Sequence, residues 1–233
     1  MSERLYLDHN VFFREIDGTY LFLDSAKDKY LTLTGAQAEW FSEIRQSGNA
    51  STLSTNALKF SDRLTQSGLV RTQSEGGKPI EEIHYQTPEY SVFMRGADVP
   101  PSASVKDAPR FFMTYMASCL SHRHNKTDVS RTLQAVKHWK SGLPDARADL
   151  RKRAIELTER FHGLTPFFYT SYDACFFTSL FLVKYLSRFG LSADWVFAVR
   201  LVPFSAHCWV EFDHVVLNED YDKTLAFKPI MLA

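Results

Sequence analysis

Hydrophobic and polar residues alternate near the start of the chain in a pattern typical of strands. Two alternating runs, Val11–Ile16 and Thr19–Asp24, flank the dipeptide Asp17-Gly18, which is a strong signal for a tight hairpin turn. A third run, Lys29–Thr34, follows after a short polar loop. We therefore predict three strands, the first two of which form a hairpin.

The hydrophobic period then lengthens to that of a helix. Thr34 and Gln37 have the spacing of a capping box, and the helix that they open ends near Gly48. A second helical pattern runs from about Ser54 to Gly68. Three strands followed by helices predict a small α+β domain that resembles a winged helix.

The last part of the chain reverses this order, with helices before strands. We predict a helix capped by Thr127-Asp128, helices over Asp145–His162 and Ala174–Phe189, and strands over Trp195–Val202, Ala206–Asp213 and Val215–Asn218. The helix over Ala174–Phe189 is apolar nearly all round, which indicates a buried central helix. This part is therefore predicted as a helix packed on an antiparallel sheet.

Prolines and glycines separate these two patterns. Gly76-Gly77 ends the first, and Pro88, Pro100, Pro101 and Pro109 follow. We predict an α+β chain with a first domain over residues 1–80, a linker over residues 81–108 and a second domain over residues 109–233.

Composition narrows the class of protein. The 233 residues are 45% hydrophobic, and 27 basic residues balance 27 acidic ones. This balance argues against a general nucleic-acid binder, which needs a basic field. The charged N-terminus differs from a signal peptide, and no apolar run reaches the ~20 residues of a membrane helix. Three cysteines without framework spacing favour reduced thiols, so we expect a cytoplasmic protein that binds neither membrane nor nucleic acid.

Cys175 is the first candidate for chemistry. It lies in the first turn of the predicted central helix, just after Asp173, a good N-cap. The partial positive charge of a helix N-terminus favours a thiolate, which is the form that attacks carbonyl carbon. The alternative is a small buried core cysteine. His207 lies at the entry of a predicted strand, from which it can reach such a helix end and act as a base for the thiol. Its presence favours the interpretation of Cys175 as a nucleophile.

A third group is needed to orient the imidazole of His207. The candidates are Asp213, Glu219 and Asp220. If Asp213-His214 forms a two-residue turn, Asp220 is opposite His207 in the hairpin, whereas a three-residue loop places Glu219 there. The sequence leaves this register open.

Metal and nucleotide sites have weaker signals. Cys119, His122 and His124 lie close together in the sequence, as do His207, Cys208 and His214, but neither group has the paired spacing of a zinc finger. The chain also contains neither a phosphate loop nor a dinucleotide-binding glycine motif. We therefore expect no metal and no other cofactor.

The C-terminal motifs resemble one known family. The segments Tyr172–Leu180, Val199–Glu211 and Val216–Asp220 are similar to the lasso-peptide maturation B proteins, which are transglutaminase-like cysteine proteases of the wider papain/transglutaminase-like group. The shared pattern is a cysteine before a Ser-Leu helix, a Pro-Phe pair, His-x-Trp-Val-Glu, and a strand that ends in Asn and an acid. In that family an Asp is common where this chain has Glu219, and Ala or Ser is usual where it has Cys208.

The first part resembles the PqqD-like leader-recognition domain, with Asp24, Tyr30 and Trp40 in matching places. The resemblance implies that a precursor leader adds as a strand beside Lys29–Thr34 and fills a groove next to the second helix. The predicted leader-binding residues are Lys29, Tyr30, Leu31, Thr32, Leu33, Leu58, Asp62 and Leu64.

Together the two resemblances imply a leader peptidase of lasso-peptide biosynthesis. Cys175 would cut between leader and core, His207 would move the proton, and Glu219 or Asp220 would orient His207. The freed core amine would then be cyclised by an ATP-using, asparagine-synthetase-like partner. Two alternatives are kept: a transglutaminase-like acyl transferase that passes the acyl group to an amine, and a non-catalytic peptide-binding chaperone.

Overall fold

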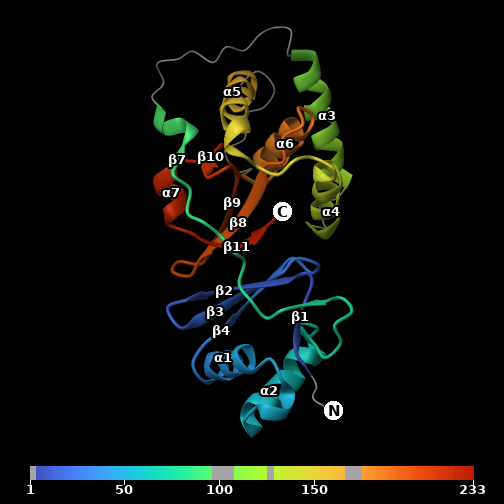
Figure 1. Cartoon of the computed structure of the whole chain (residues 1–233), viewed down its shortest axis with the longest axis vertical. Coiled ribbons are helices and arrows are strands. Elements are labelled where there is room, and N and C mark those ends of the chain that lie inside the picture. The colour runs from blue at the N-terminus through green and yellow to red at the C-terminus, as the bar shows by residue number, and fades with distance from the viewer. Residues whose placement is uncertain (1–3, 96–107, 125–128, 166–174) are drawn as a thin grey trace. The chain divides into compact units, whose positions relative to one another are not determined.

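The computed structural model describes residues 4–95, 108–124, 129–165 and 175–233. The chain divides into two compact units, Met1–His84 and Tyr85–Ala233 (Figure 1). The first unit therefore extends four residues beyond the predicted boundary at residue 80. Residues 85–95, which were predicted as part of a linker, belong to the second unit.

The three predicted N-terminal strands form one antiparallel sheet. Strands β2 (Val11–Ile16), β3 (Thr19–Asp24) and β4 (Lys29–Leu33) are arranged in the order β2-β3-β4. Asp17 and Gly18 both have positive φ, 50° and 74°, as the hairpin prediction requires. Because β4 is an edge strand, one side of its backbone is not paired to any strand in the described part of the chain.

A second small sheet in this unit was not predicted. It consists of β1 (Tyr6–Asp8) between β5 (Val70–Arg71) and β6 (Gly77–Lys78), in segments too short to show alternation. The glycine of β6 is required by close packing, because a Cβ on Gly77 would lie 2.7 Å from the Cβ of Tyr6.

Two helices cover the sheets of the first unit: α1 (Ala36–Ser47) and α2 (Thr55–Gln66), joined through the 3-10 helix η1 (Ala50–Thr52). Their apolar faces pack on the strands, and Phe13, Phe22 and Phe41 form the aromatic centre of the core. The predicted capping box is wrong, because α1 begins after Gly35, whose φ is 53°, without a side-chain cap.

The second unit contains most of the helices. Its helical elements are η2 (Val92–Arg95), α3 (Ala108–His124), α4 (Val129–Lys140), α5 (Ala148–Leu164), α6 (Cys175–Ser187) and α7 (Tyr221–Leu225). Helix α6 is buried, as predicted, because α3, α4 and α5 contact it on one side and β8 and β9 on the other (Figure 1).

A five-stranded sheet completes this unit, in the order β11-β8-β9-β10-β7. Its strands are β7 (Tyr90–Ser91), β8 (Asp194–Arg200), β9 (Ser205–Phe212), β10 (Val215–Val216) and β11 (Lys228–Leu232). The sheet is mixed rather than antiparallel, because β7 enters from the predicted linker and pairs with β10 in parallel. Neither β7 nor β11 was predicted.

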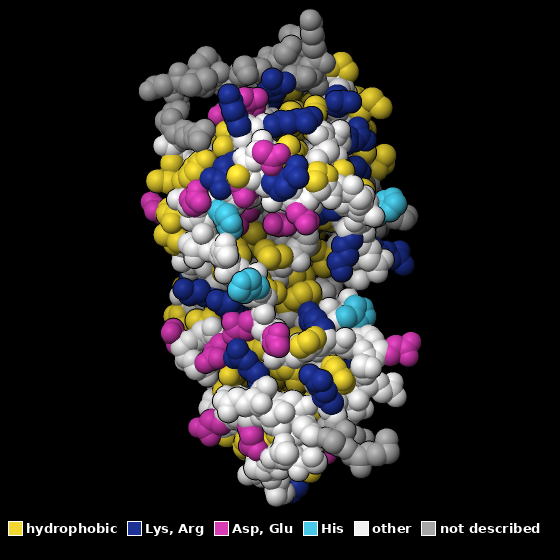
Figure 2. Space-filling model, viewed as in Figure 1, with side chains coloured by type: hydrophobic (Ala, Val, Ile, Leu, Met, Phe, Trp, Pro, Cys, Tyr) yellow, Lys and Arg dark blue, Asp and Glu magenta, His cyan; other side chains and the backbone are white. Residues whose placement is uncertain are grey.

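Charges of both signs are mixed on the visible surface (Figure 2), in keeping with the balanced composition. None of the described helices is both long enough and apolar enough to span a membrane.

Candidate active site

Cys175 is the first residue of α6, so its thiol lies at the helix end that carries partial positive charge. The side chain is neither fully buried nor fully exposed. Asp173, the predicted N-cap, lies outside the described residues. The helix position expected for a nucleophilic cysteine is therefore present.

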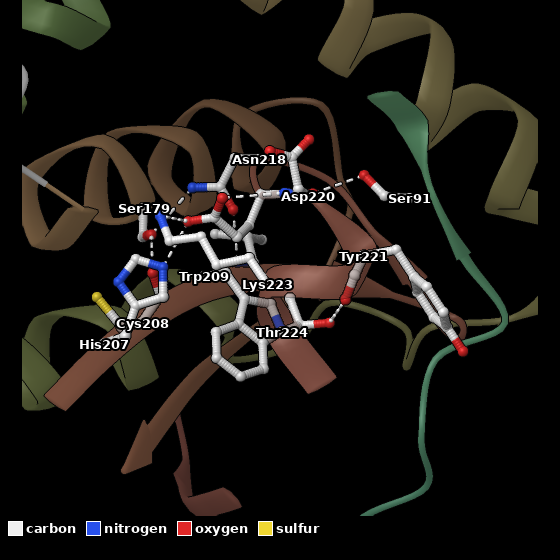
Figure 3. A network of polar contacts seen from close by, with 12 residues as sticks. Ser91, Ser179, His207, Cys208, Trp209, Asn218, Asp220, Tyr221, Lys223 and Thr224 are labelled. Carbon is white, nitrogen blue, oxygen red and sulfur yellow. Dashed lines mark hydrogen bonds and ion pairs between the residues drawn. The ribbon is translucent and has the colours of Figure 1, made fainter. Parts of the chain in front are cut away.

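A chain of hydrogen bonds fixes α6 against β9 just behind this cysteine (Figure 3). Ser179, one helical turn after Cys175, donates to the carbonyl of Cys208 at 3.4 Å. The Asn218 side chain donates to Ser179 Oγ at 3.0 Å and accepts from the Val210 N–H at 2.7 Å. One amide thus links the helix to the strand.

The turn between β9 and β10 has two residues. Asp213 and His214 both adopt left-handed conformations, with φ of 47° and 63°, and Val215 pairs with Phe212 across the turn. This is the shorter of the two turns considered in the sequence analysis. Continued without a break, its register would place Asp220 opposite His207.

Glu219 nevertheless contacts the imidazole. His207 Nε2 lies 2.5 Å from Glu219 Oε2. The ladder stops early, because the backbone of Leu217 is the last to pair with β9, and beyond it the Asn218 side chain takes the place of the backbone. The following residues leave the strand direction, and the carboxylate of Glu219 turns towards His207.

The other two candidate acids have different positions. Asp220 precedes α7 as its N-cap residue and makes no side-chain capping bond. The carboxylate of Asp213 accepts from Arg151 Nε at 2.6 Å. Of the three carboxylates, only Glu219 is bonded to His207 among the contacts that the structure describes.

The thiol and the imidazole shift each other's pKa. Hydrogen bonding from Cys208, and the hydrogen bond and charge of His207, outweigh burial and lower the pKa of Cys175 to about 4. Burial lowers the pKa of His207, but hydrogen bonds with Cys175 and Glu219 outweigh it and raise the value to about 9. At neutral pH the site therefore contains a thiolate and an imidazolium.

Glu219 remains ionised beside this pair. Burial raises its pKa, but hydrogen bonds from His207, Lys223 and the backbone of Asp220 lower it to about 2. Lys223 Nζ lies 2.8 Å from Oε2, and the Asp220 N–H lies 3.0 Å from Oε1. The carboxylate can therefore orient His207 and stabilise its charge.

Several residues of this environment were missed by sequence reasoning. Phe227, whose ring centroid is 5.3 Å from that of His207, belongs to the segment that leads into the unpredicted β11. Asn218 bonds the Val210 N–H and Lys223 contacts Glu219, and both contacts depend on the bend after β10, which the sequence pattern did not predict. Ser179 could have been found, because a residue four positions after Cys175 lies on the same helix face.

The predicted leader-binding residues divide by burial. Leu31 is 44% exposed on β4 and Leu58 is 39% exposed on α2, and Lys29, Thr32 and Asp62 are also exposed. Tyr30 is half-buried. The remaining two differ from the expectation, because Leu33 and Leu64 lie in the hydrophobic core and their side chains cannot contact a peptide at the surface.

Within the described ranges, no group of three or more His, Cys, Asp and Glu residues is arranged to hold a metal ion. The side chains of His122 and His124, near the end of α3, are not among those that the structure describes.

The comparisons with known proteins agree with this geometry. Residues 113–232, slightly more than half of the chain, match the model of the transglutaminase-like superfamily, whose members are typically Cys–His thiol enzymes. No curated protein and no solved structure was found to match the chain. The matched segment contains Cys175, His207 and Glu219, and the chain belongs to the transglutaminase-like superfamily.

Proposed function

We propose that this chain is the leader peptidase of a lasso-peptide pathway, which binds a ribosomal precursor and cuts between its leader and core. One observation carries the proposal: Cys175 at the start of α6 and the imidazole of His207 shift each other's pKa, and Glu219 contacts Nε2 of that imidazole. This arrangement suits attack on a peptide carbonyl, and the resemblance of the motifs supplies the substrate class.

The proposed mechanism is acyl transfer to water. The Cys175 thiolate attacks the scissile carbonyl, and the His207 imidazolium gives its proton to the departing core amine. Neutral His207 then takes a proton from water, which hydrolyses the thioester. Glu219 keeps the imidazole oriented and stabilises the imidazolium. Backbone N–H groups in the first turn of α6 lack helical partners and would bind the oxyanion.

Leader recognition is assigned to the first unit. The outer edge of β4 offers backbone donors and acceptors to an added strand, and exposed Leu31 offers an apolar contact. The Lys27 ammonium donates to the Ser67 carbonyl at 3.1 Å, so the turn before β4 lies close to the end of α2. The proposed leader site uses both elements, the outer edge of β4 and the face of α2 that exposes Leu58.

The partner in this proposal is an asparagine-synthetase-like cyclase. Hydrolysis leaves a free amine on the core, and closing that amine onto a carboxylate side chain requires an activated acid. The described residues of this chain contain no feature that we assign to ATP. The partner would therefore supply the activation, and this chain would supply the amine.

Superfamily membership favours a second candidate, transfer of the acyl group from Cys175 to an amine instead of water. The two reactions differ in their products: hydrolysis gives two peptides, whereas transfer in the presence of an added amine gives an amide of the leader. The non-catalytic chaperone predicts neither product.

Mass spectrometry of a precursor encoded beside this gene, incubated with the protein, tests the proposal. We expect separate leader and core peptides with the wild type and with Cys119→Ala, and intact precursor with Cys175→Ala or His207→Ala. Those two variants should retain leader affinity within about threefold, less than about 1 kcal/mol. Cleavage by Cys175→Ala would overturn the nucleophile, and an amide product would favour the transferase.

A further inference from the structure

Cys208 lies beside the candidate nucleophile although it is on a different element. It pairs with Phe197 across the sheet, on the face where Phe176 of α6 also contacts Phe197. Its carbonyl accepts from Ser179, one turn after Cys175. Figure 3 shows Cys208 next to His207, with Ser179 nearby. Cys208 is the largest cause of the lowered pKa of Cys175, and Cys175 contributes to the raised pKa of Cys208, in keeping with two neighbouring thiols at this junction of helix and strand.

The two thiols differ in chemistry. Cys175 is partly exposed, and its lowered pKa of about 4 makes it a thiolate at neutral pH. Cys208 is 4% exposed, and burial together with the charge of Cys175 raises its pKa well above the usual value. Oxidants react with accessible thiolates, and a second thiol in contact can then resolve the oxidised sulfur.

We propose that Cys175 and Cys208 are a peroxide-responsive pair that forms a reversible disulfide and thereby switches off the thiol at the candidate site. Formation of the disulfide is inferred from the position of Cys175 at the start of α6 and of Cys208 on β9, where its carbonyl accepts from Ser179, and it does not depend on the proposed function. Its effect on activity rests on the proposed function, because a disulfide removes the nucleophile from His207.

The reaction balances with hydrogen peroxide as the oxidant. The Cys175 thiolate attacks one peroxide oxygen, the O–O bond breaks, and sulfenic acid and hydroxide form. Cys208 sulfur then attacks Cys175 sulfur, the S–O bond breaks, and the S–S bond forms. The proton from the Cys208 thiol leaves with the hydroxide as water. The hydroxide from the first step takes the proton that Cys175 had passed to His207. Two thiols and one peroxide thus give one disulfide and two waters.

The direct test is peptide mapping of the reduced full-length chain after brief treatment with hydrogen peroxide. We expect an intact mass lower by two hydrogen atoms and a peptide pair linked through Cys175 and Cys208, both reversed by dithiothreitol. Cys119→Ala is the matched control and should give the same link. Linkage through Cys119, or no loss of hydrogen, would overturn the proposal.

The variant Cys208→Ser distinguishes oxidation of Cys175 from the later attack of Cys208 on the oxidised sulfur. Serine keeps the size of the side chain and a hydrogen-bond donor, but it cannot form the disulfide. In this variant we expect Cys175 to pass through sulfenic acid, trapped by dimedone, to sulfinic acid that dithiothreitol does not reduce. Equal reversibility in Cys208→Ser and the wild type would overturn the proposal.

Cleavage assays on the same samples test whether the disulfide switches off activity. Wild-type activity should be lost with peroxide and regained with dithiothreitol, whereas Cys208→Ser, compared with its own reduced sample, should not recover. A wild type that forms the disulfide but keeps its cleavage rate would overturn the switch. If no reduced sample cleaves precursor, the proposed function fails, while the mass data still decide whether the disulfide forms.

Discussion

Lys223 and His207 contact the same carboxylate oxygen of Glu219, at 2.8 and 2.5 Å. The ammonium therefore competes with the imidazolium for one negative charge. Lys223 lies one helical turn after Glu219 along the chain, and its side chain is 52% exposed. The strength of the His207–Glu219 pair thus depends on a residue at the surface.

Removing this competitor should move the pH profile. We expect Lys223→Gln to raise the pKa of His207 and to shift the basic limb of the cleavage rate upward by about 0.2 to 0.7 pH unit, the range for an exposed ion pair. The measurement is kcat/KM against pH. Lys152→Gln, an exposed lysine on α5, is the control, and a downward shift would contradict the competition.

The cleavage rate itself should follow a broad bell. The reactive form has an ionised Cys175 and a protonated His207, so activity should rise through about pH 4 and fall through about pH 9. The two apparent pKa values of this profile belong to the coupled Cys175–His207 pair rather than to either residue alone. Single-turnover rates across this range provide the check, and a rate that keeps rising above pH 9 would indicate a neutral His207 acting as general base.

Mutation of the three candidate carboxylates should change the cleavage rate by clearly different amounts. Glu219→Gln removes the charge beside His207, and we expect a loss of cleavage rate on the order of 10²–10⁴-fold with unchanged leader binding. Asp220→Asn and Asp213→Asn should lose less than about threefold, a change of under 1 kcal/mol. Single-turnover kinetics of all three rank them, and an Asp220 variant as slow as the Glu219 variant would contradict the contact seen here.

Leader affinity should depend on exposed apolar residues of the first unit. We expect Leu31→Asp and Leu58→Asp each to weaken leader binding about tenfold or more, about 1.4 kcal/mol, because each places a charge in the proposed groove. Isothermal titration with the full chain is the measurement. Leu225→Asp is a matched control, since Leu225 is 47% exposed in the second unit, and equal loss there would remove the groove assignment.

A buried carboxylate away from the candidate site should control stability. Glu211 accepts from Tyr85 Oη at 2.7 Å and from Trp209 Nε1 at 2.5 Å, and burial raises its pKa. Tyr85→Phe removes one donor and should lower the free energy of unfolding of the second unit by about 1–3 kcal/mol at pH 7.

The sign of its pH dependence follows from the raised pKa. The folded state favours protonated Glu211, so stability is lost as pH rises through its folded pKa. Loss of the Tyr85 donor raises that pKa further, and the destabilisation should be smaller at pH 5 than at pH 7. Urea unfolding followed by tryptophan fluorescence measures both, with Tyr6→Phe in the first unit as control.

The sequence predicted those parts of the fold that depend on residues close together in the chain. The Asp17-Gly18 hairpin and the buried helix after Cys175 depend on turn chemistry and apolar pattern, and both are confirmed. Strands β7 and β11 depend on partners distant in sequence, and β7 has only two residues. Their pairing could not be predicted from alternation.

The carboxylate that contacts His207 could not be predicted for a similar reason. The sequence left two lengths open for the turn at Asp213-His214, and the two-residue turn that forms would favour Asp220 over Glu219 by the register rule. That rule failed because the Asn218 side chain replaces the backbone in the ladder, and the chain bends after it. A side chain that substitutes for a backbone hydrogen bond leaves no periodic trace in the sequence.

The edge of β4 that has no strand partner among the described residues also constrains the solution behaviour of the protein. An edge that can accept a peptide strand can accept the same edge of another copy, so peptide-free protein at high concentration is exposed to edge-to-edge aggregation. Lys29 is exposed at one end of this short strand and would lie against its own copy in a parallel, in-register pair, so like charges oppose that pairing. Storage at low ionic strength, where this repulsion is least screened, should therefore keep the protein monodisperse.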